Sequence, residues 1–225
     1  SAGRRAAPAR VADYIALTKP RLNLLVVVTS AAGYYLGATA PAASARMLVA
    51  VIGTALVAGG SAVLNQVYER DTDALMRRTR QRPLPGQRVS TLPAMLFGLV
   101  LSALGVALLV VGTNWLAGGL ALTTLAIYLL IYTPMKRTSP LSTVVGAVPG
   151  ALPAVIGWAA ARGDISVGGW TLFAIVFLWQ IPHFMAIAWM YREDYRNAGF
   201  PMLAVVESDG MRTGQQALLY ALALL

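Results

Sequence analysis

Long apolar runs separated by short polar segments dominate this chain. An α-helix needs about 20 residues to cross a bilayer, and six of the runs are close to or above that length. They cover residues 22–39, 47–64, 92–112, 115–132, 141–161 and 170–190. A seventh run begins near Gln215 and reaches the last residue, Leu225, after too few positions to cross. The pattern predicts an all-α, polytopic transmembrane helical bundle with six full spans and a truncated seventh.

The composition agrees with a membrane protein, because 57% of the 225 residues are hydrophobic and only 12% are charged. Soluble domains are usually about 25% charged. The runs are rich in glycine, alanine, serine and threonine, which let transmembrane helices pack closely. No linker divides the chain, so we expect residues 1–225 to form a single integral-membrane domain, incomplete at its C-terminus. The absence of cysteine excludes disulfides and thiolate metal sites.

The net charge of +9 is distributed very unevenly between the two sides of the predicted bundle. Every lysine and arginine except Arg46 and Arg162 lies in one set of loops. The positive-inside rule places these loops, and the N-terminal segment 1–20, in the cytoplasm. We therefore expect membrane lipid as a partner and no nucleic acid. Residues 1–19 lack the apolar core of a signal peptide. Their short length and Asp13 favour a bacterial plasma membrane, with a mitochondrial inner membrane as the alternative.

The acidic residues also lie on the cytoplasmic side, with the exception of Asp164, although topology does not require this. Asn65, Glu69 and Asp73 are spaced four residues apart and share one face of a helix. Asp71 points away from that face unless the helix has already ended. Magnesium binds one or two carboxylates and completes its shell with water and substrate phosphates. A magnesium site for a phosphorylated substrate is therefore one interpretation.

The alternative is a solvated helix end at which these acids pair with Arg70 and Arg77. A dense group of arginines follows the acids: Arg77, Arg78, Arg80 and Arg82. Arginine binds phosphate oxygens through two parallel hydrogen bonds. Anionic lipid headgroups satisfy the same cluster equally well. Among these four residues Arg82 is favoured, because Pro83 and Pro85 fix the backbone after it. Lys136 and Arg137 are either further phosphate ligands or plain topology markers.

A second acid pair, Glu193 and Asp194, lies at the cytoplasmic end of the sixth span. It is suited to a second metal ion or a cationic group, or else to a salt bridge at the helix end. The only histidine, His183, follows Pro182 within that span. Proline kinks a helix, and ionisable groups at membrane depth usually face a cavity. His183 is then a base or an axial ligand of a haem iron. A structural histidine bonded across the bundle is the alternative.

The sequence resembles the UbiA superfamily of intramembrane prenyltransferases. Residues 65–73 are similar to its first motif, Asn-x-x-x-Asp-x-x-x-Asp, with Glu69 in the middle place. In place of the second motif, Asp-x-x-x-Asp, the chain has Tyr191 and Tyr195 with Glu193 and Asp194 between them. Further similar stretches resemble, more narrowly, the branch of the superfamily that farnesylates protohaem IX. They are residues 69–85, 132–140, 179–184 and 191–199.

This resemblance implies a bundle of the UbiA prenyltransferase type, which has nine helices. It also implies transfer of a farnesyl group from farnesyl diphosphate to a vinyl group of haem B, giving haem O and diphosphate. Mg²⁺ is the implied cofactor, and a haem A synthase is an implied partner. The implied metal ligands are Asn65, Glu69 and Asp73, with Asp71, Glu193 and Asp194 as further candidates. The implied diphosphate ligands are Arg77, Arg78, Arg82, Lys136 and Arg137.

The resemblance assigns catalysis to Asp73, Glu69 and His183, and the haem side of the site to His183, Tyr191 and Tyr195. An alternative within the superfamily is a prenyltransferase that acts on an aromatic quinone precursor. His183 and the segment 191–195 argue against it. A non-enzymatic transport or assembly protein is a second alternative. A transporter would distribute charged groups through the bundle, whereas these gather at one surface, and an assembly protein needs no aligned acids.

Overall fold

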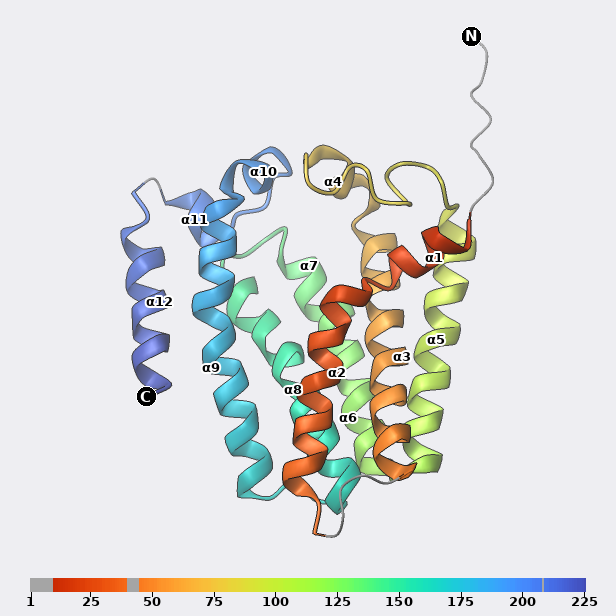
Figure 1. Ribbon diagram of the computed structural model, residues 1–225. Helices are drawn as coiled ribbons and strands as arrows, with labels where there is room; N and C mark the ends of the chain where they lie inside the picture. Colours follow the sequence, from red (N-terminus) through yellow and green to blue (C-terminus); the bar gives the residue numbers. More distant parts are fainter. Residues whose placement is uncertain (1–9, 40–44, 208) are drawn as a thin grey trace.

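The computed structural model describes residues 10–39, 45–207 and 209–225, and within these ranges the chain is helical and contains no β-strand. The helices are α1 (Val11–Leu17), α2 (Pro20–Gly37), α3 (Ala45–Tyr68), α4 (Arg70–Leu75), α5 (Thr91–Gly112), α6 (Trp115–Ala126), the π-helix η1 (Ile127–Tyr132), α7 (Thr133–Met135), α8 (Ser142–Arg162), α9 (Val167–Met190), α10 (Arg192–Asn197), α11 (Leu203–Val206) and α12 (Met211–Ala223). Figure 1 shows the long helices running side by side as a bundle. The predicted all-α class is therefore confirmed.

Among the described residues, five helices are long and apolar enough to cross a membrane, and a sixth span results if α1 and α2 count as one. That pair is bent by 50°. The bend lies at Lys19, whose backbone adopts the left-handed conformation (φ 50°), and Pro20 then begins α2. Proline suits the first position of a helix because its missing N–H has no intrahelical partner there. The apolar pattern predicted the span but not the bend.

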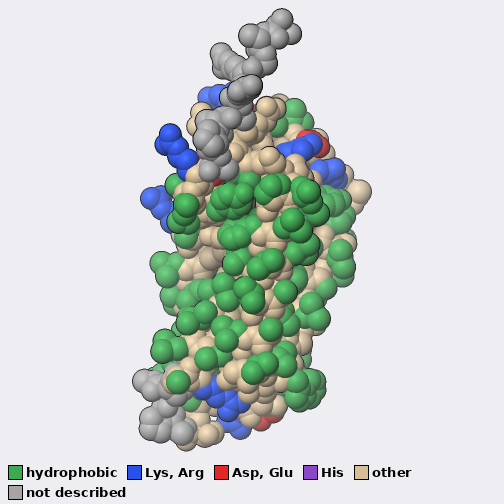
Figure 2. Space-filling view, turned by 90° about the vertical axis from the view of Figure 1, so that its right-hand side faces the viewer, with side chains coloured by type: hydrophobic (Ala, Val, Ile, Leu, Met, Phe, Trp, Pro, Cys, Tyr) green, Lys and Arg blue, Asp and Glu red, His purple; other side chains and the backbone are tan. Residues whose placement is uncertain are grey.

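Apolar side chains cover the middle of the bundle, and the charged ones gather towards its two ends on the face seen in Figure 2. Leu22, Leu48, Leu96, Leu122 and Ile175 are all more than 45% exposed. Lipid chains solvate such side chains, while the helices satisfy their own backbone hydrogen bonds. The protein is thus an integral membrane protein.

The long helices pack through small residues, as the composition predicted. Helix α3 runs along α5, and α8 lies against α2, α6 and α9. A side chain added at Gly60 would collide with the hydroxyl of Ser102 on α5, so α3 and α5 touch almost backbone to backbone. Helix α8 is deeply buried along most of its length although it contains Pro149 and Pro153.

The short helices α1, α4, α10 and α11 gather at one end of the bundle, at the top of Figure 1. Both acid-bearing segments lie at this end, and the chain between α4 and α5 is tied to α1 by an ion pair between Arg88 and Asp13 (2.8 Å). Residues 1–9 of the predicted N-terminal segment, with Arg4 and Arg5, lie outside the described residues.

Candidate active site

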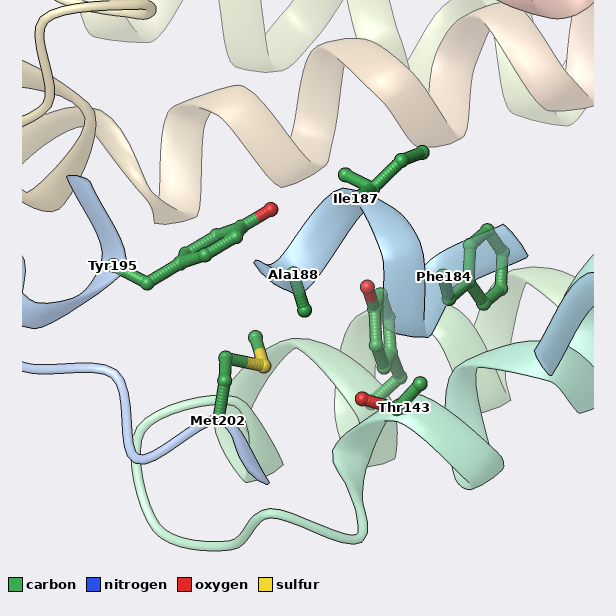
Figure 3. A pocket seen from close by; sticks show the side chains of 7 residues that line it. Thr143, Phe184, Ile187, Ala188, Tyr195 and Met202 are labelled. Carbon is green, nitrogen blue, oxygen red and sulfur yellow. The ribbon is translucent and has the colours of Figure 1, made fainter. Parts of the chain in front are cut away.

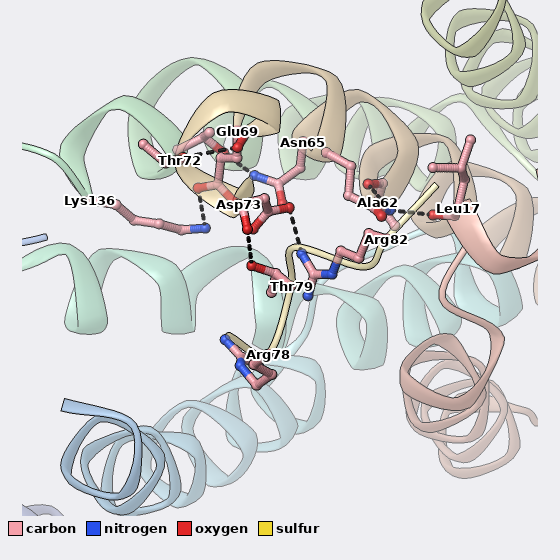
Figure 4. A network of polar contacts seen from close by, with 12 residues as sticks. Leu17, Ala62, Asn65, Glu69, Thr72, Asp73, Arg78, Thr79, Arg82 and Lys136 are labelled. Carbon is pink, nitrogen blue, oxygen red and sulfur yellow. Dashed lines mark hydrogen bonds and ion pairs between the residues drawn. The ribbon is translucent and has the colours of Figure 1, made fainter. Parts of the chain in front are cut away.

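Three oxygen-bearing side chains emerge from the end of α3 into a buried polar network. Asn65, Glu69 and Asp73 are only 1%, 6% and 1% exposed. Helix α3 ends at Tyr68, but the Glu69 N–H still donates to the Asn65 carbonyl (2.9 Å) and the Asp73 N–H to the Glu69 carbonyl (2.7 Å). The four-residue spacing therefore keeps its helical geometry across the break. Figure 4 shows the three side chains in this network.

Each acid of this face pairs with a cation from elsewhere in the chain (Figure 4). Asp73 Oδ2 accepts a hydrogen bond from Arg82 Nη1 (2.8 Å), and Glu69 Oε1 accepts one from Lys136 Nζ (2.7 Å). Buried charges are stable only when paired and hydrogen-bonded. Of the five predicted diphosphate ligands, the structure thus brings Arg82 and Lys136 directly to the acids.

Lys136 follows α7 and lies over the ring of Tyr132, with its nitrogen 4.5 Å from the ring centre. Burial alone would lower the pKa of Lys136, but Tyr132 and the Glu69 carboxylate outweigh burial and raise it. The ammonium group therefore stays charged under physiological conditions. A permanently charged donor at this place is suited to an anionic ligand.

Lys19 is a further basic residue near this site that the sequence did not single out. It lies in the break between α1 and α2, where Arg82, Lys136, Glu69 and Asp73 are its electrostatic neighbours. Gln66 on α3 holds the break in place by donating to the Leu17 carbonyl (2.6 Å). The only signal in the sequence was a lysine before a proline at the start of a span, which says nothing about its neighbours.

Asn65, Glu69 and Asp73 fit a magnesium ion in number and chemistry. The Asn65 amide nitrogen donates to Thr133 Oγ1 (3.1 Å), so its carbonyl oxygen remains available as a ligand. Each ion pair uses one carboxylate oxygen, which leaves a second oxygen on each acid. The described residues contain no cluster of three His, Cys, Asp or Glu side chains, so the set rests on two carboxylates and an amide. Magnesium usually takes one or two protein carboxylates.

The second acidic segment makes different contacts. Asp194 accepts hydrogen bonds from the backbone N–H groups of Arg77 and Arg78, each at 3.3 Å. The Arg78 guanidinium lies 4.8 Å from the centre of the Tyr191 ring, and its Nη2 is 3.5 Å from Tyr195 Oη. These contacts join the segment after α4 to α10, and we name them the loop clasp.

The other predicted site residues lie outside the buried network. Asp71 is 82% exposed and pairs with Arg70, and Glu193 is 66% exposed and pairs with Arg196. Arg77 is exposed, and Arg137 lies over the Tyr68 ring at 5.2 Å. The structure thus does not place Asp71 or Glu193 with Asp73, and their assignment as metal ligands stays a prediction.

A small cavity lies between α8, α9 and α10, and Figure 3 shows most of its lining. Its volume is about 70 Å³, and it is lined by Tyr132, Thr143, Phe184, Ile187, Ala188, Tyr195 and Met202. Sites for drug-sized ligands are about 300–1,000 Å³, so this cavity is too small to hold such a ligand by itself. Two of the lining residues also contact cations: the Tyr132 ring lies under Lys136, and Tyr195 Oη contacts Arg78.

His183 is exposed on α9 and stacks on the ring of Trp179 at 5.4 Å. Its neighbour Phe184 lines the cavity. His183 is thus exposed and is not among the residues that line the cavity. Its predicted role as a base or iron ligand stays a prediction.

A comparison with protein families agrees with this geometry. The model of the UbiA prenyltransferase family matches residues 26–225. The chain belongs to this family. It is therefore an intramembrane prenyltransferase, and the resemblance found in the motifs is confirmed.

Curated relatives in the family narrow the comparison. The chain is 49% identical to the protoheme IX farnesyltransferase of Solibacter usitatus (strain Ellin6076), over 95% of this chain and 76% of that protein. It is 46% identical to the protoheme IX farnesyltransferase of Koribacter versatilis (strain Ellin345), over 95% of this chain and 70% of that protein.

Solved structures share the fold of this family member. A UbiA homolog from Aeropyrum pernix K1 aligns with a TM-score of 0.77 at 23% identity, over 91% of this chain and 76% of that one. A UbiA homolog from Archaeoglobus fulgidus, bound to GPP and Mg²⁺, aligns with a TM-score of 0.74 at 20% identity, over 94% of this chain and 75% of that one.

Proposed function

We propose that this chain transfers the farnesyl group of farnesyl diphosphate to a vinyl group of haem B, forming haem O and diphosphate. The observation that carries the proposal is the buried face of Asn65, Glu69 and Asp73 with Arg82 and Lys136 against it. The relatives named protoheme IX farnesyltransferase support the choice of donor and acceptor. We place the protein in a bacterial plasma membrane with this site facing the cytoplasm, as the distribution of lysine and arginine predicts.

On the donor side, Asn65, Glu69 and Asp73 would hold Mg²⁺. When bound, this ion draws electron density from the diphosphate and so makes it a better leaving group. Arg82 and Lys136 are already oriented by the acids and present N–H donors to the diphosphate oxygens. Such preorganised donors stabilise charge as it develops on the leaving group. The amino group of Lys19 lies near the same charged residues.

On the acceptor side, the chain supplies an apolar wall. The C–O bond of farnesyl diphosphate breaks with its electron pair going to diphosphate. The vinyl π electrons of haem B then form the new C–C bond, and water adds to the resulting cation and releases a proton. Phe184 and Ile187, which line the cavity, keep other water away from the allylic cation. We assign His183, Tyr191 and Tyr195 to the haem side.

The test uses membranes that contain the chain, Mg²⁺ and isotope-labelled farnesyl diphosphate, with either haem B or 4-hydroxybenzoate as the acceptor. We expect labelled haem O from the first mixture and no prenylated benzoate from the second. Transfer to the aromatic acid alone would replace the proposal with a quinone-type prenyltransferase. No transfer to either acceptor would overturn it in favour of a transport or assembly role.

The haem-side assignment has its own test in His183→Ala. We expect this variant to weaken haem binding, measured by the Soret band, more than the binding of inorganic diphosphate. Equal loss of both would show general damage to the fold instead. Association with a haem A synthase stays a prediction, to be checked by co-purification.

A further inference from the structure

The π-helix η1 ends next to Asn65, and the hydroxyl group of the residue that follows it, Thr133, contacts the Asn65 side chain. π-Helical turns are rare and frequently occur at functional sites. Thr133, which follows η1, is fully buried (0% exposed). Both its backbone N–H and its side-chain O–H donate to the carbonyl of Tyr128, the hydroxyl at 2.7 Å. The wide turn of η1 thus fixes Thr133 by two bonds to one acceptor.

The second contact of Thr133 is with Asn65 on α3. Asn65 Nδ2 lies 3.1 Å from Thr133 Oγ1, and Asn65 is itself 1% exposed. A hydroxyl has one hydrogen, and Thr133 gives it to Tyr128. Its oxygen therefore faces Asn65 as an acceptor, and only the NH₂ end of the amide can satisfy it. The two ends of an amide are otherwise interchangeable in shape.

This arrangement determines which way the Asn65 amide is turned. With the NH₂ end bound to Thr133, the carbonyl oxygen is the end left for a cation held with Glu69 and Asp73. Were the amide reversed, its NH₂ group would face that cation and repel it. Reversal would also turn the amide oxygen towards the Thr133 oxygen, and two buried acceptors without a donor between them are unfavourable.

We propose that Thr133 is a positioning residue, which orients the Asn65 amide so that its oxygen faces the magnesium ion. The inference rests on the proposed function, because it takes Asn65 as a ligand of that ion. Thr133 itself touches neither substrate nor metal. Partners of metal ligands typically contribute about 10- to 100-fold to metal affinity.

The experiment compares Thr133→Val, which keeps the shape and loses the hydroxyl, with Thr133→Ser, which keeps the hydroxyl. Binding of Mn²⁺ in the presence of inorganic diphosphate is measured by electron paramagnetic resonance, without turnover. We expect Thr133→Val to weaken Mn²⁺ binding about tenfold or more, and Thr133→Ser to remain close to the parent. In turnover, Thr133→Val should raise the Mg²⁺ concentration for half-maximal rate more than it lowers the rate at saturating Mg²⁺.

Three results would overturn the inference. One is equal Mn²⁺ binding by Thr133→Val and the parent. Another is equal weakening by the valine and serine variants, which would show a packing effect. The third is additive loss in Asn65→Ala/Thr133→Val, because without the amide the hydroxyl should no longer matter. If Thr133→Val does not fold, Thr133→Ala takes its place.

Asn65→Ala alone separates this inference from the proposed function. Unchanged Mn²⁺ binding in that variant would remove Asn65 from the metal site, and the role of Thr133 with it. Weak Mn²⁺ binding in Asn65→Ala together with normal binding in Thr133→Val would overturn the role of Thr133 alone and leave the proposed function intact.

Discussion

The two acid-bearing segments, at the end of the bundle that carries α4 and α10, lie close together but are built in opposite ways. Glu69 and Asp73 are buried and pair with cations that are distant in sequence or separated by a loop. Glu193 is exposed and pairs with an arginine one turn away, and Asp194 binds backbone N–H groups. Both segments follow long apolar helices, so their position in the sequence does not distinguish them. Burial and the type of partner do.

This difference has chemical consequences. An unpaired charge in the interior costs several kcal/mol, so a buried carboxylate requires organised counter-ions. An exposed ion pair contributes only about 0–1 kcal/mol. We therefore expect substitutions in the first segment to change the affinity of the proposed site for ions and diphosphate. Substitutions in the second segment should change only how the loop after α4 is held. The expected effects of substitution differ accordingly.

The largest effect should come from Asp73→Ala, with Asp71→Ala as the matched control. Asp73 is buried and bound to Arg82, whereas Asp71 lies two residues away and is 82% exposed. We expect Asp73→Ala to lower haem O formation at least about 100-fold, the typical loss for a group that stabilises developing charge. Asp71→Ala should stay within about twofold, because surface substitutions rarely change the free energy of unfolding by more than about 0.5 kcal/mol.

Labelled haem O is measured in membranes, and elution of the purified variant as a single species in detergent shows that it is folded. Asp73→Asn keeps the shape of the side chain and guards against a packing artefact. Retained haem O formation in Asp73→Ala would contradict the prediction. Equal loss in both alanine variants would also contradict it, because the buried and the exposed acid would then matter equally.

An intermediate effect should follow from opening the loop clasp with Asp194→Ala. The change removes the acceptor of two backbone hydrogen bonds, each worth about 1 kcal/mol. We expect faster hydrogen exchange at residues 77–80, faster tryptic cleavage there, and a several-fold rise in KM for farnesyl diphosphate. Glu193→Ala is the matched control, since it removes the adjacent exposed acid but no bond to the loop. If the two variants exchange alike at 77–80, the clasp does not order that segment.

The smallest effect should be a pH dependence at α12. Burial tends to raise the pKa of Glu207. Hydrogen bonds from the backbone N–H and hydroxyl of Thr213 and from the backbone N–H of Arg212 outweigh burial and lower the pKa. A lowered pKa means that the carboxylate stabilises the folded state at neutral pH and that this contribution is lost as the pH falls through its folded-state pKa.

We therefore expect amide exchange of residues 211–223, corrected for its intrinsic pH dependence, to increase in acid. Glu207→Gln should show the increased exchange already at neutral pH. Asp209→Asn is a nearby control, which neutralises an acid that accepts a single hydrogen bond from the Met211 N–H. Exchange that does not depend on pH in the parent would show that Glu207 does not hold the start of α12.

Most of the fold could be predicted because lipid imposes a simple rule on the chain. Only closed hydrogen-bonded elements cross a bilayer, so an apolar run of sufficient length has few alternatives to a helix. The predicted run 47–64 lies within α3, and the run 92–112 within α5. The bend at Lys19 and the π-helix before Thr133 were missed, since each depends on the local backbone conformation and not on hydropathy.

The candidate site could be predicted in part. The spacing of Asn65, Glu69 and Asp73 places them on one face because it depends on helix geometry alone. Their counter-ions depend on which loops meet in the fold. The sequence therefore offered five candidate cations but did not predict that Lys136 pairs with Glu69. Thr133 was missed for the same reason, since its contact with Asn65 joins two residues that are 68 positions apart in the sequence.

The close contact between α3 and α5 inside the membrane also affects the position of Asn65 in the candidate site. Gly60 leaves no room for a methyl group against Ser102, and Asn65 follows five residues later on the same helix. The depth at which these two spans interlock therefore determines the height of the amide at the membrane surface. We expect a variant such as Gly60→Ala, which alters no charge, to shift Asn65, the first proposed ligand of the ion. Ionisation of the prenyl donor would then depend on steric fit inside the membrane.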